Sequence, residues 1–266
     1  MYSVNYHRAS SVADAVKLLK KAEDGQVVSG GMTLIPAMKT RLAAPSDLVD
    51  LRHVDELKGI KVSGKTVTIG AATTHADVAA SDKLAKVCPA ICHLAAHIGD
   101  PHVRHMGTIG GSLANNDPAA DYPAAMLALD ATIVTNKREI AAAKFFKGLF
   151  ETTLKDGEIV TAVTFTAPAK CGYAKFPNPA SRYAMTGVFV AKGKDGVRAA
   201  VTGAGDDGVF RSKEIEAALA KKFDAAALEG VVVPSRDLMS DIHASAEYRA
   251  NLVVVMAKRA VAAANA

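Results

Sequence analysis

The stretch that decides the fold is Gly107-Thr108-Ile109-Gly110-Gly111-Ser112, taken together with a second glycine-rich segment. That second segment, Gly30-Gly31-Met32-Thr33, lies far earlier in the same chain. Glycine has no side chain, so each segment can turn tightly and leave its backbone N–H groups accessible. Two such segments supply the converging donors that a diphosphate needs, and the hydroxyls of Thr33, Thr108 and Ser112 add further hydrogen bonds. The pair therefore predicts a diphosphate site.

The spacing of the glycines separates this site from the common nucleotide motifs. It fits neither Gly-x-Gly-x-x-Gly nor Gly-x-x-x-x-Gly-Lys-Ser/Thr, so a Rossmann site and a P-loop are both disfavoured. Each segment alone is more often an ordinary turn than a ligand site. Both together, with Arg104 adding positive charge nearby, favour a different type of nucleotide fold.

The composition is that of a soluble globular protein. The 266 residues are 50% hydrophobic, enough for two domains, and the 22% of charged residues are spread without long blocks. The net charge of +5 is mild, and Lys and Arg are interleaved with Asp and Glu, whereas a nucleic-acid binder gathers its basic residues on one face. We therefore expect no nucleic-acid partner.

The termini and the cysteines predict a cytoplasmic protein. The start of the chain has no apolar signal core, and two basic residues cut off the apolar run at residues 252–256, so we expect no transmembrane segment. The odd count of three cysteines fits reduced thiols. His97, His102 and His105 match no zinc spacing, so no metal site is expected.

Hydrophobic periodicity switches between helix and strand along the whole chain, which predicts an α+β order. One helix is expected to begin after Ser11, which with Asp14 forms its N-terminal cap, and to end at Gly25. Another is expected to begin at Pro89 and to end at Gly99. Residues 168–172 look like a linker. Further strands are expected at residues 26–29, 47–51, 60–62, 66–69, 132–135, 138–141, 158–166, 183–191 and 197–203, and further helices at residues 123–129, 212–220, 225–228 and 246–263.

Two longer stretches around the glycine pairs match a known family. Ser29-Gly30-Gly31-Met32-Thr33-Leu34-Ile35-Pro36-Ala37-Met38-Lys39 resembles the first FAD loop of the flavin-carrying medium subunits of molybdenum hydroxylases, the carbon monoxide dehydrogenase and xanthine dehydrogenase type. The stretch from His102-Val103-Arg104-His105-Met106-Gly107 to Ala119-Ala120-Asp121 resembles their second loop. The resemblance continues through Tyr173-Ala174-Lys175-Phe176 to Asp241-Ile242-His243-Ala244-Ser245-Ala246-Glu247-Tyr248-Arg249, and so covers essentially the whole chain.

This resemblance implies an architecture. Residues 1–167 would form an α+β FAD-binding domain of the PCMH (vanillyl-alcohol-oxidase-like) type, with subdomains at residues 1–52 and 53–167. Residues 168–266 would form a small α+β domain like the C-terminal domain of carbon monoxide dehydrogenase flavoproteins, a three-stranded antiparallel sheet with helices.

The resemblance also assigns cofactor-binding residues. The glycine segments would bind the FAD pyrophosphate. Asp121 would accept hydrogen bonds from ribose or ribityl hydroxyls, and it would point away from the phosphates because their negative charge repels its carboxylate. A structural alternative for Asp121 is a helix cap before Pro123. Tyr173, Lys175 and Tyr183 would approach the isoalloxazine from the C-terminal domain, with core packing as the alternative. The expected cofactor-binding set is Ser29, Gly30, Gly31, Met32, Thr33, Leu34, Thr108, Gly110, Gly111, Ser112, Asp121, Lys175 and Tyr183.

Three residues depart from the usual family pattern: Met32, where a polar residue is usual, and His105-Met106, where Asn-Arg is frequent. These changes affect side-chain contacts. They leave the backbone contacts in place, because an N–H group does not depend on residue type unless proline replaces it.

The implied function is electron transfer. FAD would supply the redox chemistry and the chain would position it, so no catalytic acid or base is expected. A large subunit would hold a molybdenum–pterin cofactor and oxidise the substrate, and a small subunit would hold [2Fe–2S] clusters, since this chain lacks the four-cysteine run that a cluster requires. Electrons would pass from FAD to a quinone or NAD. The three subunits would form a heterotrimer, doubled to a heterohexamer.

Several alternatives stay open at this point. The likeness favours carbon monoxide dehydrogenase, but a purine or another N-heterocycle is also compatible as the substrate of the large subunit. A flavin-free scaffold subunit and a free-standing FAD oxidoreductase are the two alternative functions of the chain.

Overall fold

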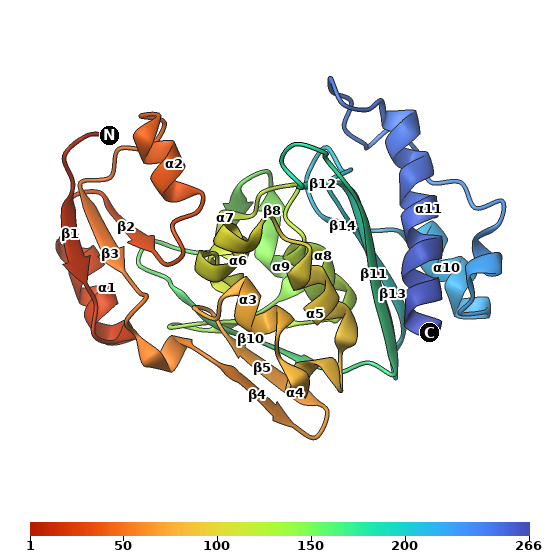
Figure 1. Ribbon diagram of the computed structural model, residues 1–266, viewed down its shortest axis with the longest axis horizontal. Helices are drawn as coiled ribbons and strands as arrows, with labels where there is room; N and C mark the ends of the chain where they lie inside the picture. The colour runs from red at the N-terminus through yellow and green to blue at the C-terminus, as the bar shows by residue number, and fades with distance from the viewer.

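Three larger sheets follow one another in the chain, and a two-stranded sheet accompanies the central one (Figure 1). The computed structural model describes all 266 residues, with an N-terminal sheet, a central sheet covered by helices and a C-terminal sheet backed by a long helix. The predicted α+β class is confirmed. No helix has both the length and the apolar character needed to span a bilayer.

The N-terminal part consists of β1 (Asn5–Arg8), α1 (Val12–Lys21), β2 (Gly25–Val28), α2 (Leu34–Lys39), β3 (Asp47–Asp50) and a 3-10 turn, η1 (Asp55–Leu57). Its strands are parallel, in the order β1-β3-β2, and the central strand β3 is buried along its whole length. Ser11 caps α1 as predicted, by accepting a hydrogen bond from the N–H of Asp14. The helix ends at Lys21, however, and Gly25 opens β2 instead of stopping the helix.

The central part consists of β4 (Ile60–Ser63), β5 (Thr66–Gly70), α3 (His75–Ala79), α4 (Asp82–Ala85), α5 (Pro89–Ala96), α6 (Pro101–Met106), α7 (Ile109–Asn115), α8 (Tyr122–Ala128), β6 (Thr132–Thr135), β7 (Glu139–Ala141), α9 (Ala142–Phe145), β8 (Phe146–Gly148), β9 (Glu151–Thr152) and β10 (Val160–Thr166). The sheet is antiparallel, in the order β4-β5-β10-β6-β7, and both predicted hairpins are confirmed. The largest hydrophobic core lies between this sheet and the helices α3, α5 and α8.

The second glycine segment is mostly helical, which the sequence analysis did not predict. Gly107 separates α6 from α7, and Thr108 caps α7 by accepting a hydrogen bond from the N–H of Gly111. Glycine weakens a helix by about 1 kcal/mol relative to alanine, so local propensity does not indicate a helix here. Tertiary packing provides the reason: a Cβ on Gly110 would lie 2.5 Å from the Cβ of Ala71, so only glycine fits.

The C-terminal part consists of β11 (Lys170–Pro177), β12 (Ala184–Gly193), β13 (Gly196–Thr202), β14 (Phe210–Arg211), α10 (Lys213–Lys221), a 3-10 turn η2 (Ala225–Leu228) and α11 (Ala246–Asn265). Its antiparallel sheet has the three long strands that were expected and adds the two-residue β14 at one edge. The prediction of a linker at residues 168–172 is wrong in part, because β11 begins at Lys170. One face of the sheet packs against α5 and α8, and α11 covers the other (Figure 1).

The C-terminal sheet shares its core with the central part. Cys171, Tyr173 and Phe189 belong to the same hydrophobic cluster as the central helices. The three cysteines are buried free thiols, and the Sγ atoms of Cys88 and Cys171 lie 3.5 Å apart, well beyond the disulfide bond length of about 2.05 Å. The domain division at residue 168 stays a prediction.

Gly172 marks the closest approach of β11 and α11, since a Cβ on it would overlap the carbonyl of Ala260. We expect Gly172→Ala to lower the free energy of unfolding by about 1–3 kcal/mol, because the methyl group has to displace the strand or the helix. Gly193→Ala, in the neighbouring strand with nothing within 4 Å of its Cβ, is the matched control and should change stability by less than about 0.5 kcal/mol. Urea denaturation measures both. Equal stability of the two variants would contradict the close packing.

Candidate functional site

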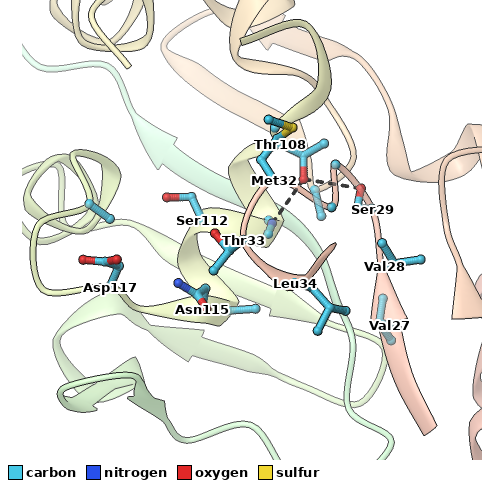
Figure 2. Close-up of a pocket in the computed structure, with 18 of the residues that line it drawn as sticks. Val27, Val28, Ser29, Met32, Thr33, Leu34, Thr108, Ser112, Asn115 and Asp117 are labelled. Atoms are coloured by element: carbon cyan, nitrogen blue, oxygen red, sulfur yellow. Dashed lines mark hydrogen bonds between the residues drawn. The ribbon is translucent and has the colours of Figure 1, made fainter. Parts of the chain in front are cut away.

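A cavity of about 670 Å³ is lined by all three parts of the chain. Its walls come from β2 and the loop to α2, from α3 and the α6–α7 region, from β10, and from the loop at residues 181–183. This volume lies within the range of about 300–1,000 Å³ that small-molecule and cofactor sites occupy. All of the predicted cofactor-binding residues except Lys175 line the cavity, and Figure 2 shows several of them around one space.

Residues 29–34 form a row of unpaired donors. None of their six backbone N–H groups donates a hydrogen bond within the chain. Gly31 adopts the left-handed region at φ 70°, which turns successive N–H groups toward one side in the manner of an anion-binding nest. A negatively charged ligand would satisfy these donors.

The two glycine segments lie against each other, as the sequence analysis expected. A Cβ on Gly30 would lie 2.6 Å from the Cα of Gly107 and would overlap the carbonyl of Met106. The hydroxyl of Thr108 donates to Ser29 Oγ at 3.3 Å, and Figure 2 shows this bond. The first segment is therefore held in place by backbone contact with the second.

The second segment offers fewer free donors than predicted. The N–H of Gly110 donates to Ala71 O at 2.8 Å, the N–H of Gly111 to Thr108 Oγ1 at 3.2 Å, and that of Ser112 to Thr108 O at 3.0 Å. Within residues 107–112 only the N–H of Thr108 has no acceptor. The start of α7 therefore uses most of the donors that the sequence analysis expected the second segment to offer.

Asp121 belongs to a buried network at one end of the cavity. Its carboxylate accepts a hydrogen bond from the Tyr173 hydroxyl and lies 3.0 Å from Lys175 Nζ. Burial raises the pKa of Asp121, and the charge of Lys175 and the hydroxyl of Tyr173 oppose that shift. The alternative of a helix cap does not hold, because Asp121 precedes α8 but its side chain accepts no hydrogen bond from the helix.

The three residues expected near the isoalloxazine have different positions. Tyr183 lines the cavity and is 45% exposed. Tyr173 and Lys175 lie behind Asp121, away from the cavity wall, with the Lys175 side chain only 6% exposed. A direct contact between Lys175 and a ligand is therefore not supported by this geometry. Its ammonium acts on the site through the carboxylate of Asp121.

The Arg104 guanidinium makes its hydrogen bonds to the backbone and not to the cavity, although its charge acts on the cavity residue His75. Its guanidinium donates to Ile98 O at 3.0 Å and to Gly99 O at 3.1 Å, the carbonyls just beyond α5. A cation at the end of a helix is favourable because the helix dipole is negative there. The hydrogen-bond donors of the first segment are therefore backbone N–H groups and not this side chain.

The sequence analysis missed several polar residues of the cavity wall, among them His75, Asp117 and Glu158. Asp117 accepts a hydrogen bond from the N–H of Ala119 at 2.9 Å, and burial raises its pKa. Figure 2 shows it near Asn115 and Ser112. Asp117 lies within the stretch that carried the family resemblance, so that stretch contained the signal. His75 follows a helix cap and has no local motif.

Glu158 is the third carboxylate of the wall, and it is fully neutralised. It accepts hydrogen bonds from Arg138 Nε at 2.9 Å, from Thr135 Oγ1 at 2.8 Å and from the N–H of Lys155 at 3.0 Å. The Arg138 guanidinium, followed by these other donors, lowers the pKa of Glu158 to about 2. The residue is thus charged at neutral pH but adds no net negative charge to the cavity.

Comparison with known proteins gives consistent results. Residues 2–168 match the family described as the FAD binding domain in molybdopterin dehydrogenase. The chain is 37% identical to the carbon monoxide dehydrogenase medium chain of Afipia carboxidovorans, with 99% of this chain and 97% of that one covered. It is 33% identical to the nicotine 6-hydroxylase medium subunit of Paenarthrobacter nicotinovorans, over 99% and 98% of the two chains. The fold is similar to a chain of reconstituted CO dehydrogenase from Oligotropha carboxidovorans, with TM-score 0.89, 36% identity and coverage of 99% and 98%.

The ion pair of Lys175 with Asp121 provides one test of the site. We expect Lys175→Met to lower the free energy of unfolding by about 3–5 kcal/mol, because it leaves a buried carboxylate without a compensating charge. The double variant Asp121→Asn/Lys175→Met removes both charges and retains an acceptor for Tyr173, so it should recover most of that loss. Urea denaturation at neutral pH measures both variants. A double variant as unstable as the single one would contradict the pairing.

Glu158 provides a test that depends on pH. Because its pKa in the folded chain, about 2, lies below the ordinary value of 4.5, Glu158 contributes stability above pH 4.5 and loses it as the pH falls toward 2. We expect Glu158→Gln to be less stable than the parent chain by about 1–3 kcal/mol at neutral pH. The difference should shrink between pH 4.5 and pH 2. Denaturation curves at several pH values check this, and a difference independent of pH would count against it.

Proposed function

Since this chain belongs to the family of FAD-binding domains of molybdopterin dehydrogenases, we propose that it carries electrons on FAD within a molybdenum hydroxylase of the carbon monoxide dehydrogenase type. The family is FAD-binding and its relatives are dehydrogenase subunits, so FAD is the cofactor of this chain and the chain is a subunit of an oxidoreductase. The fold is the expected PCMH type. The assignment of individual residues and the route of the electrons are the proposed part.

One observation carries the proposal: six unpaired N–H groups at residues 29–34 line a cavity of about 670 Å³. A pyrophosphate carries negative charge on several oxygens, so it matches a row of converging backbone donors. The hydroxyls of Thr33 and Ser112 line the same cavity, and neither donates a hydrogen bond within the chain. The wall thus fits the diphosphate of a dinucleotide.

The proposed pyrophosphate contacts come from both glycine segments. The N–H groups of residues 29–34 and of Thr108 would donate to the phosphate oxygens. Gly111 has free space on its side-chain face apart from Thr108 Oγ1, which permits close approach of the ligand to the start of α7. The remaining residues of the expected set would line this part of the site: Gly110, Ser112, and the side chains of Met32 and Leu34.

The carboxylates would bind the hydroxyl-rich part of the cofactor. Asp117 accepts only one hydrogen bond in the chain, so it has lone pairs left for ribityl or ribose hydroxyls. Asp121 lines the cavity as well, with its position fixed by Tyr173 and Lys175. We therefore assign the acceptor role to Asp117 together with Asp121. Tyr183 would cover the isoalloxazine with its ring.

Bound FAD supplies the redox chemistry by exchanging electrons singly or in pairs, and the chain holds it and limits the access of water. A small [2Fe–2S] subunit would deliver the electrons, and a quinone or NAD would remove them. A large subunit with the molybdenum–pterin cofactor would oxidise the substrate, carbon monoxide being favoured by the 37% identical relative. The assembly would be a cytoplasmic heterotrimer doubled to a heterohexamer. Full-length relatives named as medium chains or subunits support this arrangement.

The first test is the binding of FAD itself. We expect the purified full chain to bind one FAD per molecule, and Gly30→Ala to weaken binding by at least about 100-fold. A side chain at position 30 separates the two segments, which removes more than one hydrogen bond to a charged group, each contributing about 1.5–3 kcal/mol. Titration followed by flavin fluorescence measures the dissociation constants, and Gly193→Ala, remote from the cavity, is the control.

The outcomes separate the proposal from its alternatives. A folded parent chain that binds no FAD would indicate the flavin-free scaffold. A flavin-loaded chain that oxidises a substrate without partners would indicate a free-standing oxidoreductase. Co-purification with a molybdenum subunit and an iron–sulfur subunit, and bleaching of the flavin by substrate only in that complex, would support the proposed electron route.

A further inference from the structure

Two buried polar atoms of the central core have no hydrogen-bond partner: Nδ1 of His75 and the hydroxyl of Tyr122. His75 is 5% exposed and Tyr122 is fully buried, and their ring centroids lie 5.4 Å apart. Buried polar atoms are almost always paired, so each of these two requires an explanation. Only one of the two residues, His75, lines the large cavity.

His75 lies directly behind the contact between the two glycine segments. It is the first residue of α3, and its backbone N–H donates to Gly107 O at 2.9 Å. Its ring nitrogen Nε2 faces Gly107 closely, since a Cβ on that glycine would lie 2.6 Å from Nε2. The same glycine touches Gly30 on its other side. The imidazole is therefore adjacent to the first segment of the proposed pyrophosphate site.

The two ring nitrogens of His75 differ in access. Nδ1 is sealed from the cavity, whereas Nε2 is not among the sealed atoms and also has no partner within the chain. Burial, together with the positive charge of Arg104, lowers the pKa of the ring to about 4. The imidazole is therefore neutral at neutral pH, with one N–H and one lone pair. A neutral ring can bind a polar ligand atom at Nε2 without introducing a buried charge.

We propose that His75 is a binding residue of the dinucleotide site, and that its Nε2 makes a hydrogen bond to a polar atom of bound FAD. This inference rests on the proposed function, because it takes the cavity to be the FAD site. It gives the imidazole, which has no hydrogen-bond partner within the chain, a partner at Nε2, while the sealed Nδ1 stays unpaired. It also gives the segment around Gly107 a further part in binding, because Thr108 has the only N–H group of residues 107–112 without an acceptor in the chain.

Four variants test this role. In Gln the amide reaches about as far as Nε2 of histidine, whereas in Asn it reaches about as far as Nδ1. We expect His75→Asn and His75→Phe to weaken FAD binding by about three- to tenfold, the effect of one net hydrogen bond, and His75→Gln to stay within about twofold. Tyr122→Phe removes the other unpaired atom, which is outside the cavity, and should leave the dissociation constant unchanged. Flavin fluorescence titration of the full chain gives the constants, and thermal unfolding of each FAD-free variant reports its stability.

The possible results are distinct. Unchanged FAD affinity in His75→Asn and His75→Phe overturns the inference. So does equal weakening in all three His75 variants in step with their melting temperatures, since that pattern indicates packing alone. A parent chain that binds no FAD overturns the proposed function and this inference with it, whereas tight binding by the parent and by every variant overturns this inference only.

A measurement on the unmodified chain does not depend on how the variants fold. Imidazole ¹⁵N NMR resolves the two nitrogens of each histidine, and the signal of His75 is assigned by its loss in His75→Gln. We expect a neutral ring whose Nε2 signal shifts when FAD is added, with Nδ1 much less affected. An Nε2 signal that FAD does not move would overturn the inference.

Discussion

The contact between Gly30 and Gly107 is the constraint on which the cavity depends. The backbones of two segments that are distant in sequence touch there without intervening side chains, and any Cβ on Gly30 would force them apart. The contact joins the N-terminal sheet to the central helices and fixes the direction of the free N–H groups at residues 29–34. Anion binding by backbone donors requires such rigid placement, because each donor is weak alone and the effect comes from convergence.

The electrostatics of the wall follow from how each carboxylate is compensated. Lys175 faces Asp121, and Arg138 faces Glu158, so two of the three wall carboxylates carry their own cation. Asp117 has none and is left with backbone and solvent. A dinucleotide with a charged centre and polar ends suits this distribution, because uncompensated negative charge beside the pyrophosphate would repel it. The same distribution explains why the two compensated residues are the more deeply buried ones.

The sequence predicted the elements with strong periodicity and clear caps, such as α1 and the hairpin of β4 and β5. It did not predict α7, because glycine-rich turns read as loops and the helix depends on packing against Ala71. The free donors of the first segment followed from residue type. Lys175 was expected at the ligand, but strand periodicity alone does not reveal that the carboxylate of Asp121, just before α8, pairs with it. His75 had no local signal, because tertiary contacts alone bring α3 behind Gly107.

The C-terminal sheet is covered on both faces, and β11 therefore packs against a different neighbour on each side. Cys171 and Tyr173 point to the central core, while Ala174 and Phe176 pack with α11. Alternate positions of this strand thus have different neighbours: one set packs against the outer helix, and the other faces the central core and the carboxylate of Asp121. A change of side-chain volume on the outer side of this strand is therefore felt first by α11, whereas a change on its inner side reaches the central core and the buried ion pair of Lys175 with Asp121.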